Sequence, residues 1–338
     1  MRRVPAARHE PSTERMTPAS QKNRTPLTQR DILRICYLFY KKEKTQEEIA
    51  SMTGLSRFKI LRILKEARES GLVSIHINDP LENLAETETK LTQTFHLKEA
   101  VVVRLKDYSD KSGIEQLGEA GADYLARVVE KSRVLGVAWG RTLFHVVDAF
   151  KQRHLRNLTV VQISGGLGSI KGSDTYVLTM TLSQKLGANA RVIQAPVIVA
   201  DRSVRDQMLH EKNIHETLQA AKRTDLAVLG IGVCSREGGL WDAGLLNGRD
   251  FLRLKKLGAV GAICGHFYNR WGKRCDTDLE DRIIGLTLEE LKNIKRKIGI
   301  AMGFEKGEAI LGALRGGWID VLITDEKTAE CVLAGSED

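Results

Sequence analysis

The segment TQEEIASMTGLSRFKILRILKEARESG, residues 45–71, has the pattern of two short helices joined by a tight turn. Thr45 and Glu48 form a capping-box pattern at the start of the first helix. Gly54 can adopt the positive φ that the turn needs, and Ser56 is the expected cap of the second helix. The segment therefore predicts a helix-turn-helix.

The second helix of this segment has one apolar and one basic face. Its apolar positions follow the spacing of a buried stripe and are Ile60, Ile63, Leu64 and Ala67. Its basic positions are Arg57, Lys59, Arg62, Lys65 and Arg68. Such a helix fits a DNA major groove, although an exposed helix of an ordinary helical domain also gathers charges. The expected DNA-binding residues are Thr45, Gln46, Ser56, Arg57, Phe58, Lys59 and Arg62.

The flanking segments favour DNA binding. Residues 73–77, VSIHI, alternate as the wing strand of a winged helix does. Residues 27–41 form a strongly apolar helix, with Thr28 as a candidate cap, that we expect to be the floor of the small domain. Pro80 ends the domain because proline cannot continue a strand ladder. We therefore expect a winged helix-turn-helix DNA-binding domain at residues 27–78.

The net charge of +9 is concentrated in the first quarter of the chain. Residues 1–26 and residues 27–77 each carry an excess of +4, which leaves +1 for the other 261 residues. This distribution favours a polyanionic partner for the N-terminal part only. Residues 1–26 lack hydrophobic periodicity and predict a disordered basic arm, which either adds phosphate contacts or is a plain flexible tail.

Composition argues against several classes of protein. No apolar run approaches the ~20 residues that span a bilayer, and the basic N-terminus lacks the apolar core of a secretory signal. The five cysteines are scattered and never form a C-x-x-C pair, which favours a reducing cytoplasm and argues against a zinc site. We expect a cytoplasmic protein with no metal ion, no cofactor and no membrane partner.

From residue 98 to residue 338, short apolar runs alternate with amphipathic helices. The expected strands are 100–103, 134–137, 158–163, 191–198, 226–231, 259–263, 283–285, 298–301 and 321–324. The expected helices are 113–131, 141–151, 176–186, 204–223, 287–295 and 306–315. This alternation predicts an α/β fold with a mostly parallel, doubly wound sheet. Between the two parts, residues 79–97 predict a linker with a connector helix that also contacts a partner subunit.

Three turns at strand ends have the composition of an anion site. They combine glycine with hydroxyl or basic side chains and are WGRT at 139–142, SGGLG at 164–168 and MGFEK at 302–306. Gly140 permits close backbone approach, while Arg141 and Lys306 place positive charges at helix starts. Ligands of parallel α/β sheets bind at such strand ends. The turns predict a site for a phosphate-bearing small molecule, although glycine turns after strands are also structurally common.

Patterns of catalysis and cofactor binding are incomplete. Gly230-Ile231-Gly232 begins like a dinucleotide fingerprint, but the third glycine is misplaced, so a strand-end turn is the better interpretation. Residues 166–171 lack the G-K-[ST] ending of a P-loop, and the chain has no G-x-S-x-G and no H-E-x-x-H. His210 and His215 are five residues apart and would not share a helix face. We assign no catalytic or metal-binding residue.

From about residue 27 onward, the chain resembles the SorC/DeoR type of bacterial sugar-binding transcriptional regulators. The resemblance is carried by residues 45–71, GVAWGRTL at 136–143, QISGG at 162–166, GAVGAICGHFYNRWG at 258–272 and IGIAMGFEKGEAILGALRGGWIDVLITDEKTA at 298–329. It implies an effector domain at 98–338 with the fold of sugar-phosphate isomerases and CoA transferases. It also implies a homotetramer whose binding to operator DNA changes when a sugar or sugar phosphate binds.

The resemblance also implies which residues bind the effector. They are Gly140, Arg141, Thr142, Gly165, Gly166, Asn269 and Lys306. Where the family usually has G-D-I and R-F-F-D-x-x-G, this chain has Ala262, His266 and Asn269, and Met302 replaces a usual glycine. Losing two carboxylates from the pocket region would change which sugar hydroxyls are recognised or which charge state of the ligand is tolerated.

Two function classes remain after this comparison. The leading one is a transcriptional regulator of a carbohydrate-metabolism operon, and the alternative is a sugar-phosphate isomerase or transferase that uses the α/β domain. An isomerase needs a positioned acid or base, and Ala262 and Asn269 remove such groups. A nucleic-acid-binding protein without ligand control would leave the glycine-rich strand ends unexplained.

Overall fold

The computed structural model describes residues 27–73, 82–106, 110–168, 174–236 and 238–336. The chain divides into two compact units, residues 1–78 and residues 79–338, and each is described by itself. The predicted arm at 1–26 and the predicted wing at 73–77, apart from Val73, lie outside the described residues.

The first unit contains three helices, α1 (Gln29–Tyr40), α2 (Gln46–Thr53) and α3 (Arg57–Glu69). The predicted caps are confirmed: Thr28 and Thr45 form capping boxes, and the Ser56 side chain accepts the Lys59 N–H. Gly54 ends α2 with φ 66°, the left-handed conformation that the turn needs. The core is formed by apolar side chains of all three helices, namely Ile35, Cys36, Ile49, Ile60, Ile63, Leu64 and Ala67.

The second unit is built on a parallel sheet of seven strands in the order β1-β10-β9-β5-β2-β3-β4. The strands are β1 (Glu99–Val103), β2 (Val134–Val137), β3 (Thr159–Gln162), β4 (Asn189–Arg191), β5 (Leu226–Gly230), β9 (Arg296–Ile300) and β10 (Val321–Asp325). Most of the central strands are buried on both faces, as a sheet covered by helices on both sides requires. The predicted doubly wound α/β fold is confirmed.

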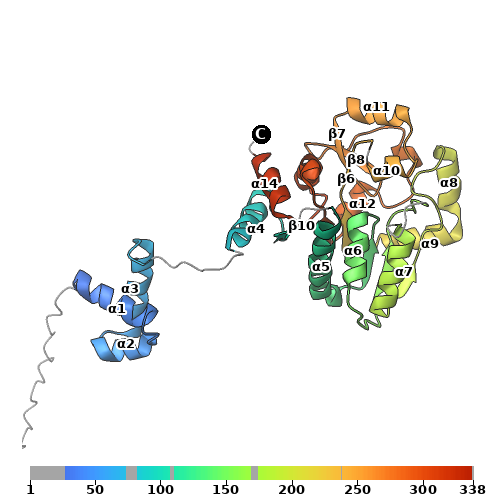
Figure 1. Ribbon diagram of the computed structural model, residues 1–338. Helices are drawn as coiled ribbons and strands as arrows, with labels where there is room; N and C mark the ends of the chain where they lie inside the picture. Colours follow the sequence, from blue (N-terminus) through green and yellow to red (C-terminus); the bar gives the residue numbers. More distant parts are fainter. Residues whose placement is uncertain (1–26, 74–81, 107–109, 169–173, 237, 337–338) are drawn as a thin grey trace, which may run out of the picture. The chain divides into compact units, whose positions relative to one another are not determined.

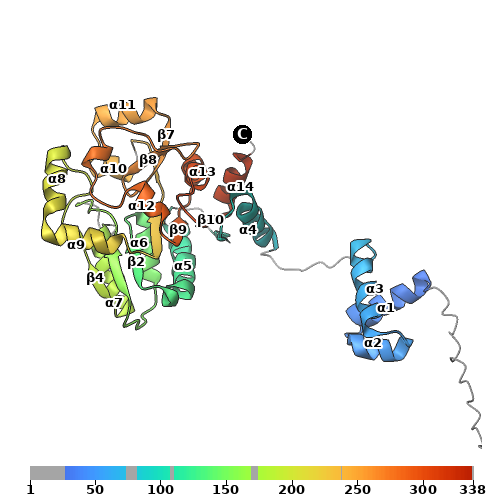
Figure 2. The same cartoon turned by 180° about the vertical axis from the view of Figure 1, so that it is seen from behind.

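Helices cover both faces of this sheet. The helices of this part of the unit are α4 (Glu82–Phe95), α5 (Asp110–Val128), α6 (Arg141–Ala149), α7 (Thr175–Leu186), α8 (Arg202–His210), α9 (Lys212–Ala221), α12 (Leu288–Lys292), α13 (Gly307–Arg315) and α14 (Glu326–Ala334), with single turns η1 (Val129–Lys131), η2 (Glu280–Arg282) and η3 (Phe304–Lys306). Of these, α8 packs on α9 and η2. Figure 1 shows α5, α6 and α7 side by side over one face. In Figure 2, seen from behind, α9 lies over the strands on the other face.

The strand order reverses between β2 and β5. From β2 the chain runs outward through β3 to β4, whereas from β5 it runs the opposite way through β9 to β10. Because crossovers between parallel strands are right-handed, the helices of the two runs lie on opposite faces. The loops after β2 and β5 therefore separate, and the reversal places a crevice at the carboxyl ends of these two strands.

A smaller antiparallel sheet is inserted after β5. It contains β6 (Gly232–Val233), β7 (Ala259–Ile263) and β8 (His266–Asn269), accompanied by α10 (Gly239–Asp242) and α11 (Gly248–Lys256). This insertion has its own hydrophobic cluster, which includes Leu240, Leu254 and Phe267. The apolar run at 259–263 is a strand as predicted, but it belongs to this small sheet and not to the parallel one.

Three sequence-based element predictions were wrong. Of the strand predicted at 191–198 only Arg191 is in a strand, and the segment otherwise makes isolated bridges around Pro196, which has no N–H for a regular ladder. Residues 283–285 also form only isolated bridges. The helix predicted at 204–223 is divided into α8 and α9, because Glu211 has extended backbone angles.

Helix α4 belongs to the second unit. Its Leu84 and Leu91 are buried in the main core, and the Glu88 carboxylate accepts the N–H of Val102 in the edge strand β1 at 2.8 Å. Burial raises the pKa of Glu88, against the opposing effect of this hydrogen bond. The helix predicted as a connector is thus packed against β1 and α14. At the other edge, β4 is only three residues long and exposed.

Candidate functional site

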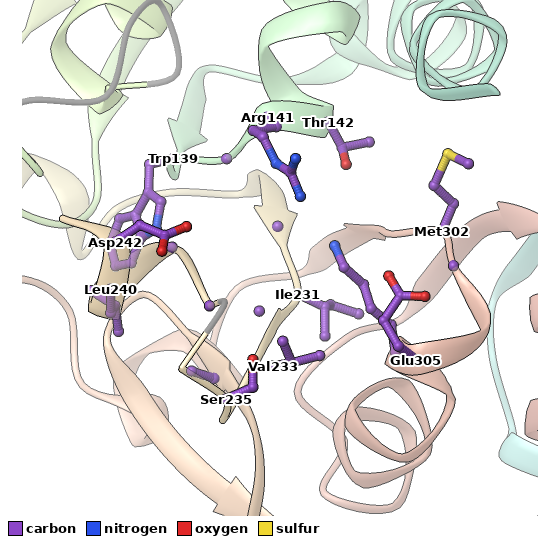
Figure 3. Close-up of a pocket in the computed structure, with 18 of the residues that line it drawn as sticks. Trp139, Arg141, Thr142, Ile231, Val233, Ser235, Leu240, Asp242, Met302 and Glu305 are labelled. Carbon is purple, nitrogen blue, oxygen red and sulfur yellow. The ribbon is translucent and has the colours of Figure 1, made fainter. Parts of the chain in front are cut away.

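A cavity of about 650 Å³ opens at the carboxyl ends of β2, β5 and β9. Its floor is the strand-end segments of the parallel sheet, and β6 and α10 of the insertion supply the opposite wall. Figure 3 shows side chains from these separate segments directed into one space. The cavity therefore occupies the crevice at the reversal of strand order, where ligands bind in open α/β sheets.

The segment after β2 presents a helix N-terminus to the cavity. Gly140 lines it with φ 146°, a conformation that side chains other than hydrogen disfavour, and no side chain caps α6. Thr142 is buried in the first turn of α6, while Arg141 is exposed and directed into the cavity in Figure 3. Uncapped first-turn amides together with a hydroxyl and a guanidinium suit an anionic ligand.

The loop after β9 brings a second positive charge. Burial lowers the pKa of Lys306, the charge of Arg141 lowers it further, and Glu305 opposes both effects. Both cations line the same cavity, and their charges repel each other. A dianion between Lys306 and Arg141 would relieve their repulsion.

The loop that carries Lys306 is fixed by hydrogen bonds. The Gly303 N–H is shared between Asp325 Oδ2 at 3.2 Å and Thr328 Oγ1 at 3.0 Å, and the Thr328 hydroxyl also donates to Asp325. Asp325 additionally caps α14 through the Thr328 N–H. These buried groups hold the backbone of the loop, so Lys306 projects from a rigid support.

Carboxylates also line the cavity, which the sequence did not reveal. Asp242 of α10 lies beside Trp139 in Figure 3, Glu305 lies on the side of Met302, and Arg141 projects between them. The segment Gly230-Ile231-Gly232, interpreted as a simple strand-end turn, lines the cavity too. No motif surrounds Asp242, and only the insertion after β5 brings it to the site.

Gly165 and Gly166 are not among the residues that line the cavity, and their role in effector binding stays a prediction. The Gly165 N–H donates to the Ile284 carbonyl at 2.8 Å, and the Gly166 N–H donates to the Ala195 carbonyl at 2.9 Å. A Cβ on Gly165 would lie 2.5 Å from the Pro196 carbonyl carbon, so this glycine is required for packing. Of this turn only Leu167 reaches the cavity.

Asn269 is also outside the cavity lining. Its Oδ1 accepts the N–H groups of Trp271 and Lys273, both at 3.0 Å, and thereby stabilises the turn after β8. His266 is buried between the Glu280 carboxylate and the Leu286 carbonyl, whereas Ala262 does line the cavity. The departures at 266 and 269 therefore affect structural positions and remove no carboxylate from the site.

Among the described residues, no group of three His, Cys, Asp or Glu side chains could hold a metal ion. Cys264 lines the cavity, but burial raises its pKa to about 12, so the thiol stays protonated at neutral pH. In the same described part of the chain, no helix has the length and apolar character to cross a membrane.

The predicted DNA-binding residues lie at the surface of the first unit. Arg57 forms an ion pair with Glu47 of α2 at 2.8 Å, and Arg62 pairs with Glu66 at 2.7 Å. Within the described residues Lys59 forms no ion pair. Thr45 and Ser56 act as helix caps, Gln46 is half-buried at the start of α2, and the Phe58 side chain is 83% exposed.

These features define a class of protein in which a basic helical unit precedes an α/β unit with an anion-suited cavity. Residues 79–334 match the family model described as "Putative sugar-binding domain". The chain belongs to this family, and it is a transcriptional regulator of the SorC/DeoR type.

Two curated relatives span almost the whole chain. The sorbitol operon regulator of Klebsiella pneumoniae is 33% identical over 89% of this chain and 97% of its own length. The deoxyribonucleoside regulator of Bacillus subtilis is 30% identical over 88% of this chain and 95% of its own length. The crystal structure of full-length SorC from Klebsiella pneumoniae superposes with a TM-score of 0.71 at 31% identity, covering 90% of this chain and 98% of that chain.

Proposed function

We propose that this chain regulates a carbohydrate-metabolism operon by binding operator DNA through its first unit, and that a sugar or sugar phosphate in the cavity modulates this binding. The observation that carries the proposal is the convergence of Arg141, Lys306 and the uncapped N-terminus of α6 in one cavity. The names of its relatives, which are operon and deoxyribonucleoside regulators, support the same class of function.

The cavity lining carries groups that suit both parts of a sugar phosphate. The phosphate would lie against Arg141, Thr142 and Lys306, where positive charge and helix amides concentrate. The carboxylates of Asp242 and Glu305 would accept hydrogen bonds from sugar hydroxyls, since an ionised carboxylate is an acceptor only. The Trp139 and Leu240 side chains offer apolar contacts for the sugar ring.

DNA binding would use the exposed side of α3 together with the start of α2. On binding, Arg57 and Arg62 would exchange their glutamate partners for phosphates, while Lys59 is already without an ion pair among the described residues. Because one such unit reads only a few base pairs, we propose a homotetramer, acting in the cytoplasm, whose copies contact sites spaced by helical turns.

The test is a thermal-shift panel on the full chain with sugars, the matching sugar phosphates, and inorganic phosphate. A sugar phosphate that raises Tm more than both its sugar and inorganic phosphate supports the proposal. The same compound should then change the affinity of the chain for its preferred DNA. A chain that no panel member stabilises, or whose DNA binding is unchanged by the stabilising compound, refutes it.

An enzyme of the isomerase or transferase type is the second candidate, because Asp242 and Glu305 place carboxylates in the cavity. We propose that the chain has no such activity, since its relatives are transcriptional regulators. Incubation of the chain with the stabilising sugar phosphate, followed by NMR of the sugar, separates the two. Turnover that is lost in Asp242→Asn or Glu305→Gln would favour the enzyme.

A further inference from the structure

Helix α3 exposes two large apolar side chains outside its buried stripe. Phe58 is 83% exposed and Leu61 is 49% exposed. They are three residues apart, so they lie on the same side of the helix. The side chains that pack α3 into its unit are Ile60, Ile63, Leu64 and Ala67, and neither Phe58 nor Leu61 belongs to that core.

Basic side chains surround this apolar pair. Arg57 and Lys59 flank Phe58 in the chain, and Arg62 follows Leu61, all of them exposed. A protein partner that covered Phe58 would have to desolvate these charges as well. A DNA major groove instead offers phosphates on both walls and only one apolar group on its floor, the 5-methyl group of thymine.

We propose that Phe58 and Leu61 recognise thymine 5-methyl groups in the major groove and so set part of the operator sequence. This inference rests on the proposed DNA-binding function. Phe58 is the second residue of α3, and the first residues of a recognition helix contact base edges. Lys59 and the two arginines supply sequence-independent phosphate contacts, whereas the apolar pair distinguishes thymine from cytosine.

The experiment begins with selection of preferred DNA from a random pool by the full chain. Each dT of the selected site is then replaced by dU, which removes only the 5-methyl group. We expect one or two positions at which this replacement weakens binding about fourfold, the effect of one buried methyl group. Phe58→Ala should weaken binding to the selected site about ten- to a hundredfold and should abolish the dU effect at the position it contacts.

Leu61→Ala tests the second residue of the pair, and Leu33→Ala is the matched control. The exposed fraction of Leu33 in α1, 47%, is close to the 49% of Leu61, but Leu33 lies on another helix. If two dU-sensitive positions are found, Leu61→Ala should abolish the dU effect at the second one. If only one is found, Leu61→Ala should reduce the effect there. Leu33→Ala should leave every dU effect unchanged. Binding to random DNA and its salt dependence should be the same in all variants, because no cation is removed. Unchanged Tm values verify folding.

The outcomes separate the two proposals. If the wild-type chain selects no sequence, DNA recognition itself fails. If it selects a sequence that contains thymine but Phe58→Ala keeps the full dU effect at every position, DNA recognition stands and methyl recognition by Phe58 is wrong. A selected site without a dU-sensitive position overturns the methyl inference in the same way.

Discussion

The turns after β2 and β3 have similar composition, but only the first contributes a glycine to the lining of the cavity. Both place glycines and hydroxyl groups between a buried strand and a helix. The turn at 139–142 lines the cavity, whereas the turn at 164–168 is filled by the chain itself. The Asp174 carboxylate accepts the N–H groups of Leu167 at 2.7 Å and Gly168 at 3.1 Å.

A turn whose composition suits an anion can therefore be occupied either by an external ligand or by a carboxylate of the same chain. The turn after β3 does bind an anion, but the anion is Asp174, which also caps α7 through the Tyr176 N–H at 2.8 Å. The turn after β2 has no internal carboxylate as a cap and lies next to β5, where the strand order reverses. The order of strands in the sheet, and not the composition of the turn, thus leaves the turn at 139–142 available to a ligand. We call the cavity beside this turn the open site, and the turn at 164–168 the filled turn.

The largest effect is expected from Lys306→Ala, which removes a cation from the open site. A charge-assisted contact of this kind contributes about 1.5–3 kcal/mol, so effector affinity should fall about ten- to a hundredfold. DNA affinity without effector should stay near that of the wild type. Calorimetric titration with the stabilising sugar phosphate measures the change, with Lys256→Ala on the exposed face of α11 as control. Full effector response in both Lys306→Ala and Thr142→Ala would place the effector elsewhere.

Gly165→Ala tests the filled turn. Its new Cβ would lie 2.5 Å from the Pro196 carbonyl group, so we expect Tm to fall by about 2–10 °C, with effector affinity retained below the transition. Gly140→Ala should instead weaken effector binding, because its φ of 146° is strained for alanine and relief of this strain would move the turn, although its Cβ meets no atom closer than 3.9 Å. Full effector affinity in Gly140→Ala, or its loss in Gly165→Ala, would contradict the distinction between the turns.

Asp174→Ala should convert the filled turn toward an open one. Loss of the α7 cap and of the partner for two amides should reduce the free energy of unfolding by about 1–2 kcal/mol. Inorganic phosphate should then raise the Tm of the variant more than that of the wild type, at ionic strength matched with chloride. An identical response of both proteins to phosphate would show that the amides do not accept an external anion.

The smallest effect is a pH dependence confined to the open site. Lys306 binds an anion in its charged form, and its pKa is lowered from 10.5 by burial and by Arg141. Effector affinity should therefore fall roughly severalfold as pH rises toward this lowered pKa. Lys306→Ala should show no such fall in titrations from pH 7 to pH 10.5, a range that includes any pKa below the ordinary value. A wild-type affinity that is constant over this range would mean that effector binding does not depend on the Lys306 charge.

Local patterns in the sequence predicted those parts of the molecule that local interactions determine. Capping residues and apolar spacing gave α1, α2 and α3, and buried apolar runs gave most strands of the parallel sheet. The open turn was predicted through Gly140, Arg141 and Thr142, together with Lys306.

Long-range contacts decided what the sequence could not show. Asp174 is six residues beyond its glycine turn, yet nothing local indicates that its carboxylate returns to those amides. Asp242 enters the cavity only because a small sheet is inserted after β5. Asn269 was assigned to the site by resemblance, whereas its hydrogen bonds belong to the turn after β8.

The packing of α4 on β1 has a consequence for how copies of this chain can associate. An unprotected edge strand offers free N–H and C=O groups to the edge of another molecule, which leads to open-ended polymers. Here Glu88 occupies the Val102 N–H, and the opposite edge ends in the short strand β4, which carries the charged Arg191. Both edges of the sheet are thus poor templates for strand addition, so we expect copies of this chain to associate through side-chain surfaces.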